Sequence, residues 1–235
     1  MAENLARAGV PVALCSAVGN DEDGRALIAH LSRAGVDVSG VVLSEEYPTS
    51  SYTAIVGPDG TLLAGASDTE AIDALSLRDL ERWWAEIQSA AWLFADCNLP
   101  SQLLAACVDR RRFASWRLAV DGTSVAKARR LPNDLSSVDV LFVNEDESAA
   151  ITSRAQFTIV SRGAAGALVI PSERDAVEIA AVEAAPVDTT GAGDALAAGS
   201  LHALLRGERI EEAVQSGMQL AARAVETHGA IPSLR

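Results

Sequence analysis

The sequence contains few of the residues that build cross-linked or metal-bound folds. Its 235 residues include three cysteines, Cys15, Cys97 and Cys107, with no C-x-x-C spacing, and three histidines that lie far from them. This pattern supports neither a disulfide framework nor a zinc site. No apolar run is long enough to span a bilayer, and the residues after Met1 lack the basic and apolar regions of a secretory signal. We therefore expect a cytoplasmic protein that does not contact a membrane.

Basic side chains are also scarce. The sequence has 19 lysines and arginines against 32 aspartates and glutamates, which gives a formal charge of -13. Such a charge opposes binding to nucleic acid or to an anionic membrane, so the predicted partner is a small molecule. Because 49% of the residues are hydrophobic, the chain can bury a sizeable core, and we predict a single domain over residues 1–235.

Two common nucleotide-binding motifs are missing. There is no G-x-x-x-x-G-K-[ST] phosphate loop, and Leu196 stands where a dinucleotide-binding G-x-G-x-x-G needs its third glycine. An S-x-x-K pair occurs at Ser124 and Lys127, but the S-D-N and K-T-G partners of a β-lactamase site are absent. We therefore interpret Lys127 as a residue on a solvated helix face.

The most distinctive stretch is the run V-D-T-T-G-A-G-D at residues 187–194, which is followed by small residues. Its glycines allow backbone amides to turn toward one point, and we expect a positive φ at Gly193. A helix predicted to begin at Asp194 adds the positive end of its dipole, which makes an anion cradle. A carboxylate beside that cradle can accept the proton of a hydroxyl group that attacks phosphorus. The alternative is that Asp194 only caps the helix.

Predicted strands alternate with predicted helices along most of the chain, which indicates a mostly parallel sheet between layers of helices. Expected helices cover residues 2–8, 21–35, 77–91, 194–205 and 210–225, and expected strands cover residues 10–17, 92–95, 117–120, 138–143, 157–160 and 167–170. Residues 50–64 read as strand, turn and strand, which predicts a hairpin within residues 48–66. Open α/β sheets bind their ligands at the carboxyl ends of the strands.

Three candidate sites follow strand ends. Asn98 follows the strand at 92–95 and is a candidate substrate contact, with a loop-capping role as the alternative. Asn144 and Glu147 have the spacing of a pair that holds hydrated Mg²⁺ beside ATP phosphates, although a helix capping box has the same spacing. Residues 161–166 carry two glycines three apart, which let a ligand approach the backbone, and a plain β-turn is the alternative.

Residues 187–194 closely resemble the D-T-T-G-A-G-D signature of the ribokinase-like (PfkB) carbohydrate kinases, and the resemblance runs along nearly the whole chain. It implies a ribokinase-like three-layer α/β/α sandwich with a mostly parallel central sheet and a small β lid. It also implies that Asp194 is the catalytic base and that ATP and Mg²⁺ are bound. The amides that would hold the transferring phosphoryl group are those of Gly191, Ala192 and Gly193.

The same resemblance implies roles for further residues. Asn144 and Glu147 match an N-x-x-E motif of the family, in which Glu147 would hold Mg²⁺ through water. The family's ATP loop matches Ser161, Arg162, Gly163 and Gly166, with Ser161 in place of the usual threonine. A monovalent cation, K⁺, is expected at Asp188, Thr190, Ala224, Gly229 and Ser233.

The hairpin resembles the family's lid over the sugar. The resemblance places Ser51, Tyr52 and Thr53 against the substrate, beside Asn98 and Asp194, whereas a half-buried β surface would also favour such residues. Lids of this kind often join two subunits, so we expect a homodimer through the lid. We also expect that the family's first strand and its Gly-Gly turn, which supply sugar-binding residues, are missing.

The sequence therefore predicts ATP-dependent phosphorylation of a hydroxyl group on a sugar or nucleoside. Within the family it most resembles the pseudouridine kinases, at residues 2–6, 50–54, 98–100 and 124–127. Pseudouridine is therefore the first expectation for the substrate, and a sugar of the ribokinase or fructokinase type is an alternative. A further alternative is a non-catalytic, nucleotide-binding regulatory protein, because part of the family's sugar site is expected to be missing.

Overall fold

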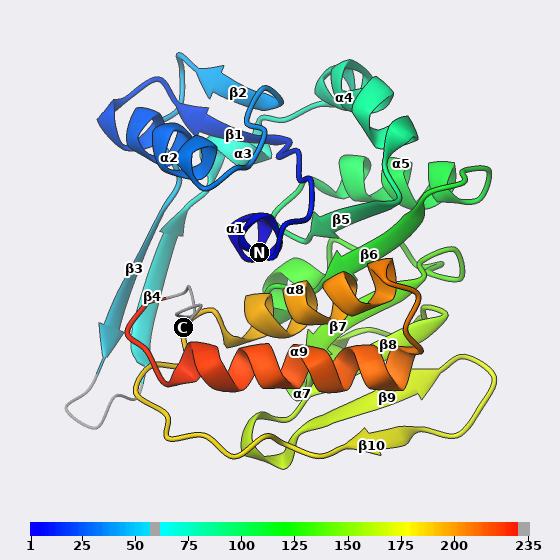
Figure 1. Ribbon diagram of the computed structural model, residues 1–235. Helices are drawn as coiled ribbons and strands as arrows, with labels where there is room; N and C mark the ends of the chain where they lie inside the picture. Colours follow the sequence, from blue (N-terminus) through cyan, green and yellow to red (C-terminus); the bar gives the residue numbers. More distant parts are fainter. Residues whose placement is uncertain (57–61, 230–235) are drawn as a thin grey trace.

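Six strands form the main sheet, in the spatial order β10-β9-β8-β7-β6-β5. They were located in a computed structural model that describes residues 1–56 and 62–229 (Figure 1). Their bounds are β5 Trp92–Asp96, β6 Arg117–Asp121, β7 Val140–Asn144, β8 Phe157–Ser161, β9 Ala167–Pro171 and β10 Val177–Ile179. β5 to β8 are parallel, β9 is antiparallel to β8, and β10 is antiparallel to β9. The prediction of a mostly parallel sheet is confirmed.

Helices cover both faces of this sheet. The longer ones are α2 Glu22–Arg33, α4 Leu77–Ser89, α5 Ser101–Arg111, α8 Ala192–Leu205 and α9 Ile210–Val225. Shorter ones are α1 Ala2–Arg7, α3 Glu70–Asp73, α6 Val125–Ala128, α7 Glu145–Ala150 and the 3₁₀ turn Gly163–Ala165. In Figure 1, α8 and α9 run side by side across the front of the sheet, and the two helices also contact each other closely.

Neighbouring residues on the central strands point to opposite layers. Leu118 and Val120 of β6 pack into the core that α4 and α5 share, whereas Ala119 between them packs into the core under α8 and α9. The central strands are thus buried on both faces, as expected for the parallel strands of an α/β protein. The predicted three-layer α/β/α sandwich is confirmed.

The small residues after the glycine-rich run allow α8 to lie close against α9. A Cβ atom added at Gly199 would lie 2.8 Å from the Gly217 Cα, and one added at Gly217 would lie 2.4 Å from the Leu196 carbonyl oxygen. Contacts this short would force the helices apart, so both positions need glycine. The packing fixes the direction of α8, whose first turn carries Asp194.

A smaller unit lies beside the main sheet. β1 (Ser16–Gly19) pairs in parallel with β2 (Val41–Ser44), and β3 (Ser51–Val56) pairs antiparallel with β4 (Leu62–Asp68). Within residues 1–56 and 62–229, no strand of this unit pairs with a strand of the main sheet. In Figure 1 the β3–β4 hairpin runs down the left side of the view, from the level of α2 and α3 to the level of α9.

Two expectations about element bounds need correction. The strand predicted over residues 10–17 is confined to β1, because the chain between α1 and β1 makes only an isolated bridge at Ala13. The last helix before β5 ends at Ser89, where Ala90 turns to an extended conformation. All three cysteines are free. No helix in the described parts of the chain has the length and apolar character needed to cross a membrane.

Candidate active site

The glycine-rich loop ends in a left-handed glycine and leads into a helix whose first amides are free. Gly191 is the N-cap of α8 and has a φ of 81°, which favours glycine. The Ala192 amide donates to the Thr189 carbonyl at 3.2 Å, whereas the amides of Gly191, Gly193 and Asp194 make no hydrogen bond to any described residue. Unpaired amides at the positive end of a helix dipole are suited to an anion.

Asp194 lies in the first turn of α8 and does not begin it. The helix begins two residues earlier than expected, at Ala192, so the alternative prediction that Asp194 is the N-cap is wrong. The positive φ expected at Gly193 falls instead at Gly191. The Asp194 side chain is 52% exposed, and its Oδ2 lies 3.5 Å from the amino group of Met1 at the start of α1. An exposed carboxylate beside free amides can accept a proton from a bound hydroxyl group.

The register of the sheet brings the strand-end candidates to one edge. Asp96 at the end of β5 is paired with Asp121 at the end of β6, and Asn144 at the end of β7 is paired with Ser161 at the end of β8. Because these strands are parallel, all four residues lie at the carboxyl edge, where α/β proteins bind ligands. Two of the predicted site residues, Asn144 and Ser161, therefore lie beside each other at this edge.

Asp121 ends β6, between β5 and β7, and belongs to none of the predicted motifs. Burial raises the pKa of the Asp121 carboxyl to about 7, and the charges of Glu147 and Asp194 act in the same direction. The Thr123 amide opposes the shift in pKa by donating to Asp121 Oδ1 at 2.7 Å. Glu147 of α7 and Asp194 of α8 are thus the charged neighbours that act on the Asp121 carboxyl together with Asp96.

A strained turn follows Asp121. Thr123 has a φ of 64°, which is unusual for a β-branched residue. A Cβ atom at the preceding Gly122 would lie 3.0 Å from Glu147 Oε2, so glycine allows this turn to pack against the β7–α7 junction. A carboxylate directly after a buried strand is the sequence signal that could have identified Asp121 as a site residue.

Asn144 and Glu147 form a complete capping box at the start of α7. The Glu147 amide donates to Asn144 Oδ1 at 2.8 Å, while the Asn144 amide and side-chain nitrogen donate to the two Glu147 carboxylate oxygens at 3.0 and 2.9 Å. The capping alternative of the sequence analysis is thus present in the structure. Glu147 is only 6% exposed. Among the residues described, no group of three or more His, Cys, Asp or Glu side chains is arranged to hold a metal ion directly.

The loop after β8 needs its two glycines for different reasons. Gly166 has a φ of 88°, and a Cβ there would lie 2.1 Å from the Ile179 carbonyl oxygen, so glycine is required by the neighbouring chain. Gly163 has a φ of 54° and no atom within 4 Å of an added Cβ. The loop is closed by the Arg162 amide, which donates to the Gly166 carbonyl at 2.8 Å. The Gly163 carbonyl accepts from the Gly166 amide at 3.0 Å, whereas the Gly163 amide has no hydrogen-bond partner among the described residues and lies beside open space.

The other loop residues are held by the sheet. The Ser161 hydroxyl donates to the Val143 carbonyl at 3.3 Å, and the Arg162 guanidinium lies 3.2 Å from the Glu178 carboxylate. The first contact joins the end of β8 to β7, and the second joins the loop to β10. Neither contact involves the Gly163 backbone. The turn alternative is thus present in the structure, because the Ala165 and Gly166 amides donate to the Arg162 and Gly163 carbonyls.

Asn98, after β5, is held by three neighbours. Its amide donates to Asp96 Oδ1 at 2.8 Å, its carbonyl accepts from Arg130 at 2.7 Å, and its side-chain oxygen accepts from the Lys127 ammonium group. Asp96, and not Asn98, is thus the capping side chain of this loop. The expected solvated position of Lys127 is wrong, because α6 turns this half-buried side chain toward β5.

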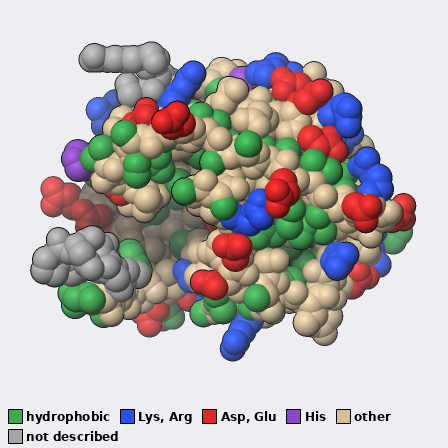
Figure 2. Space-filling model, turned by 90° about the horizontal axis from the view of Figure 1, so that it is seen from below, with side chains coloured by type: hydrophobic (Ala, Val, Ile, Leu, Met, Phe, Trp, Pro, Cys, Tyr) green, Lys and Arg blue, Asp and Glu red, His purple; other side chains and the backbone are tan. Residues whose placement is uncertain are grey.

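The hairpin residues Ser51, Tyr52 and Thr53 are exposed on β3. Tyr52 lies across the hairpin over Gly65 of β4, since a Cβ at Gly65 would meet the Tyr52 hydroxyl at 2.5 Å. The structure contradicts the alternative that these residues form a half-buried surface. Seen from below, the molecule is hollowed on the side where the hairpin lies (Figure 2). The turn of the hairpin, residues 57–61, lies outside the described residues.

The tail after α9 contacts the start of the glycine-rich loop. Asp188 accepts hydrogen bonds from the Thr190 amide at 2.9 Å and from the Gly229 amide at 3.0 Å, and both hold the pKa of Asp188 low, at about 2. The Ala224 carbonyl accepts from the Thr227 hydroxyl at 3.1 Å. Four of the five residues predicted to bind a monovalent cation therefore lie at one junction. The fifth, Ser233, lies outside the described residues.

Comparison with known proteins identifies the family of this edge-of-sheet site. The profile of the pfkB family carbohydrate kinases matches residues 1–235. This chain belongs to that family. It is an ATP-dependent kinase of the carbohydrate or nucleoside class, as the sequence predicts, and the alternative of a non-catalytic regulatory protein is not supported.

Individual relatives of this kinase agree with the assignment. The pseudouridine kinase of Escherichia coli K12 is 26% identical over 234 residues, which cover 92% of this chain and 74% of that protein. A carbohydrate kinase structure from Agrobacterium tumefaciens is 31% identical, with a TM-score of 0.84 over 98% of this chain and 79% of that one. Arabidopsis thaliana ribokinase complexed with ribose and ATP is 20% identical, with a TM-score of 0.83 over 98% and 82%. The ribokinase-like fold is confirmed.

Proposed function

We propose that this kinase transfers a phosphoryl group from ATP to a hydroxyl group of a sugar or nucleoside, with Asp194 as the general base. The observation that carries this proposal is the first turn of α8. There the unpaired amides of Gly191, Gly193 and Asp194 stand beside a carboxylate that caps nothing. Free donors stabilise charge on a transferring phosphoryl group, and the carboxylate removes the proton of the attacking hydroxyl.

The site residues fit ATP and its metal ion. When bound, Mg-ATP supplies the phosphoryl group and neutralises part of its charge. The open backbone at Gly163, beside Ser161, Arg162 and Gly166, would bind the nucleotide. Asn144 would hold Glu147 in place through the capping box, so that the Glu147 carboxylate reaches hydrated Mg²⁺ through water. The Ala192 amide already has a carbonyl acceptor, which leaves the Gly191 and Gly193 amides as the main phosphoryl ligands.

For the acceptor we propose pseudouridine. This choice is supported by the E. coli pseudouridine kinase among the relatives and by the position of Asn98 at the carboxyl edge. The Asn98 side-chain nitrogen donates no hydrogen bond within the described residues, so it can donate to a substrate oxygen. Exposed Ser51, Tyr52 and Thr53 would close over the same substrate from the hairpin.

Two further features belong to this proposal. A K⁺ ion at the junction of Asp188, Thr190, Ala224 and Gly229, with Ser233, would fix the glycine-rich loop before substrate binds. A homodimer through the lid would bury Tyr52, Ile55 and Leu63, whose exposures of 63%, 59% and 67% are high for apolar side chains. Analytical ultracentrifugation should report twice the chain mass, and a monomer at micromolar concentration would count against this interface.

An acceptor screen tests the function. Purified kinase with ATP and Mg²⁺ is incubated with pseudouridine, uridine, other nucleosides, ribose and fructose, and ADP is measured together with the mass of the product. We expect the highest kcat/KM for pseudouridine and a monophosphate product. A higher value for ribose or fructose would overturn the choice of acceptor, and the absence of any phosphorylated product would overturn the proposed function.

A further inference from the structure

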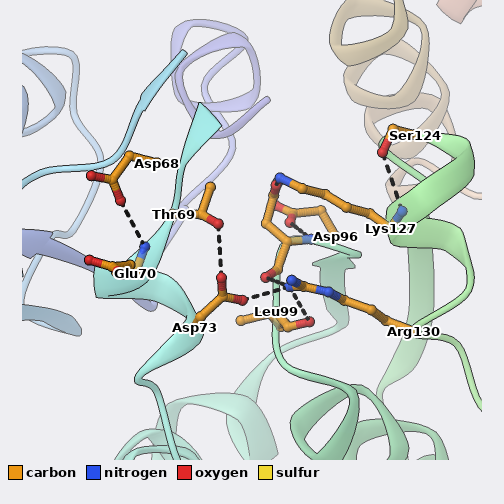
Figure 3. Close-up of polar contacts among 10 residues, drawn as sticks. Asp68, Thr69, Glu70, Asp73, Asp96, Leu99, Ser124, Lys127 and Arg130 are labelled. Atoms are coloured by element: carbon orange, nitrogen blue, oxygen red, sulfur yellow. Dashed lines mark hydrogen bonds and ion pairs between the residues drawn. The ribbon is translucent and has the colours of Figure 1, made fainter. Parts of the chain in front are cut away.

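Besides the hydrophobic core that the small unit shares with the main sheet, one arginine makes polar contacts to both at the acceptor end of the site. Arg130 follows α6, and its Nη1 lies 2.8 Å from Asp73 Oδ1 and 2.7 Å from the Asn98 carbonyl oxygen, with the Leu99 carbonyl at 3.5 Å (Figure 3). The first contact reaches α3, and the other two reach the loop after β5. One guanidinium thus contacts both bodies at once.

On the side of the small unit, Asp73 is coupled to the base of the hairpin. α3 follows β4 directly, and the Thr69 hydroxyl donates to Asp73 Oδ2 at 2.9 Å. The first residues of α3 are also fixed, because the Glu70 amide donates to Asp68 Oδ1 at 3.2 Å. Figure 3 shows the contacts from Thr69 through Asp73 to Arg130, with the Asp68–Glu70 contact beside them, so Asp73 lies close to the end of β4.

On the side of the main sheet, the same arginine fixes Asn98. Asn98 is held at three points: Arg130 donates to its carbonyl, Lys127 donates to its side-chain oxygen, and its amide donates to Asp96. These contacts fix the Asn98 side chain in one orientation and leave its side-chain nitrogen free of any partner among the described residues. A group held in one rotamer loses little freedom when it binds a ligand. The orientation of this proposed acceptor ligand therefore depends on Arg130.

The other strand of the hairpin has a different anchor. Thr49, before β3, donates to both carboxylate oxygens of Asp21, from its hydroxyl at 2.6 Å and from its amide at 2.7 Å. Asp21 also caps α2 through the Gly24 amide at 2.8 Å. These contacts stay within the small unit, so β3 is anchored to its own body while β4 is anchored across to the main sheet.

We infer that Arg130 is a positioning residue that couples the hairpin to the acceptor loop. Through Asp73 it fixes the position of the segment that follows β4, and through the Asn98 carbonyl it fixes the residue that would contact the acceptor. The position of the hairpin base and the orientation of Asn98 are thereby linked. This inference rests on the proposed function, since it takes Asn98 as the acceptor ligand, but the linkage itself can be measured without turnover.

Two variants test the linkage, with a matched control. Asp73→Asn removes the charge on the hairpin side, and Arg130→Met removes the contacts on both sides. Asp134→Asn is the control, because the Arg112–Asp134 pair, at 2.7 Å, is close in length to the 2.8 Å Arg130–Asp73 pair and is also partly exposed, but it lies away from the acceptor loop. Asp73→Asn should raise the acceptor KM by up to about fivefold, the upper range for a partly exposed ion pair. Arg130→Met should raise it by roughly tenfold or more, because the Asn98 carbonyl also loses its donor. The KM for ATP should stay unchanged in all variants.

The double variant gives the decisive comparison. If Asp73 acts through Arg130, Asp73→Asn combined with Arg130→Met should be no worse than Arg130→Met alone. Arg130→Lys should give an acceptor KM between those of Arg130→Met and the unsubstituted kinase, because lysine keeps the positive charge but lacks the planar guanidinium that contacts two oxygens at once. Additive effects of the two changes, or an equal loss in Asp134→Asn, would overturn the coupling.

Amide hydrogen exchange provides a readout that needs no substrate. Asp73→Asn and Arg130→Met should both speed exchange at residues 62–68 and at residues 97–100, whereas Asp134→Asn should leave both segments as in the unsubstituted kinase. Unchanged exchange in the first two variants would overturn the inference. If no acceptor is phosphorylated but exchange rises in both segments, the proposed function fails while the coupling stands.

Discussion

The two ends of the candidate site differ in how much of their hydrogen-bonding capacity the protein already uses. At the start of α8, three amides have no hydrogen-bond partner within residues 1–56 and 62–229, and the Asp194 carboxylate is half exposed. After β5, the amide, carbonyl and side-chain oxygen of Asn98 are all engaged by neighbouring residues. The free amides at the start of α8 are arranged to receive a charged group. The loop after β5 is arranged to present a single donor, the Asn98 side-chain nitrogen, in a fixed direction.

This difference matches the two proposed tasks. Charge on a transferring phosphoryl group needs several convergent donors, so those donors must have no partner before ATP binds. A neutral acceptor needs orientation more than charge stabilisation, and a rigid loop supplies orientation at low entropic cost. Changes at the phosphoryl end should therefore reduce turnover, whereas changes at the acceptor end should mainly raise KM.

The largest effect is expected from Asp194→Asn. It removes the proposed base but leaves Gly191 as the N-cap of α8, so turnover should fall by roughly 10²–10⁴ while the thermal unfolding midpoint and the KM for ATP stay unchanged. Steady-state ADP release and circular dichroism measure the two properties. Asp175→Asn, at an exposed residue between β9 and β10, is the control. Near-normal turnover in Asp194→Asn would reject Asp194 as the base.

The next largest effect separates the two glycines of the cradle. Gly191 is left-handed, so Gly191→Ala should destabilise the fold by about 1–2 kcal/mol. It should also lower turnover by roughly 10- to 100-fold, since it displaces the adjoining amides. Gly193 is helical and faces open space, so Gly193→Ala should leave stability unchanged or raise it.

The turnover of Gly193→Ala then locates the phosphoryl group. An added methyl group at residue 193 enters space that no described atom occupies within 4 Å, so a loss of turnover without loss of stability means that a ligand uses this space. Thermal unfolding and initial rates for both alanine variants provide the comparison. Full activity in Gly193→Ala would remove Gly193 from the phosphoryl site.

The sequence predicts the phosphoryl end of the site, at the start of α8, better than the acceptor end, after β5. Glycines, a carboxylate and a following helix are local features, so residues 187–194 could be interpreted from their own order. The helix start was misplaced by two residues, because Gly191 takes the left-handed conformation and caps the helix in place of Asp194. Strand alternation likewise predicts the sandwich, since it depends on short-range apolar patterns.

The acceptor end depends on contacts between distant segments. Asp73, Asn98 and Arg130 are far apart in the chain, and only the packing of α3, β5 and α6 brings them together. For the same reason Lys127 was interpreted as a surface residue. No local pattern specifies which side chain of a half-buried helix finds a partner across the fold, and Asp121 was missed because its burial depends on three neighbouring elements.

A smaller effect is expected from the carboxylate between the two ends. Burial raises the pKa of Asp121 to about 7, so its neutral form is favoured in the folded state. The stability that this group contributes is fully present below its unfolded pKa near 4 and is lost as the pH rises through 7. Asp121→Asn imitates the neutral form and should unfold at a higher temperature than the unsubstituted kinase at pH 8.

Thermal unfolding across pH 4 to 8 measures this difference. A gain of about 1 kcal/mol should raise the midpoint by roughly 2–4 °C in a chain of this size. The gain should shrink toward pH 4, where Asp121 is protonated in the folded state and about half protonated in the unfolded chain. A difference that is the same at every pH would show that Asp121→Asn acts through packing and not through ionisation.

The smallest effect concerns the cation proposed under the phosphoryl end. Asp188 is already held by the Thr190 and Gly229 amides, so the glycine-rich loop is partly fixed by the protein alone. A K⁺ ion at this junction would restrict only the part of the glycine-rich loop that is still free to move. Through the loop it would help to orient the free amides of α8. Turnover should then be about fivefold higher in K⁺ than in tetramethylammonium, the lower range of coupling between two sites. Ionic strength is held constant, since salt also screens surface charge.

Asp188→Asn has one side-chain oxygen and cannot accept from both amides as Asp188 does, so it should lower turnover in both salts and remove most of the difference between them. Equal turnover in the two salts would show that the contact between Asp188 and Gly229 is a packing interaction that needs no ion, and the free amides of α8 would then be ordered by the helix alone.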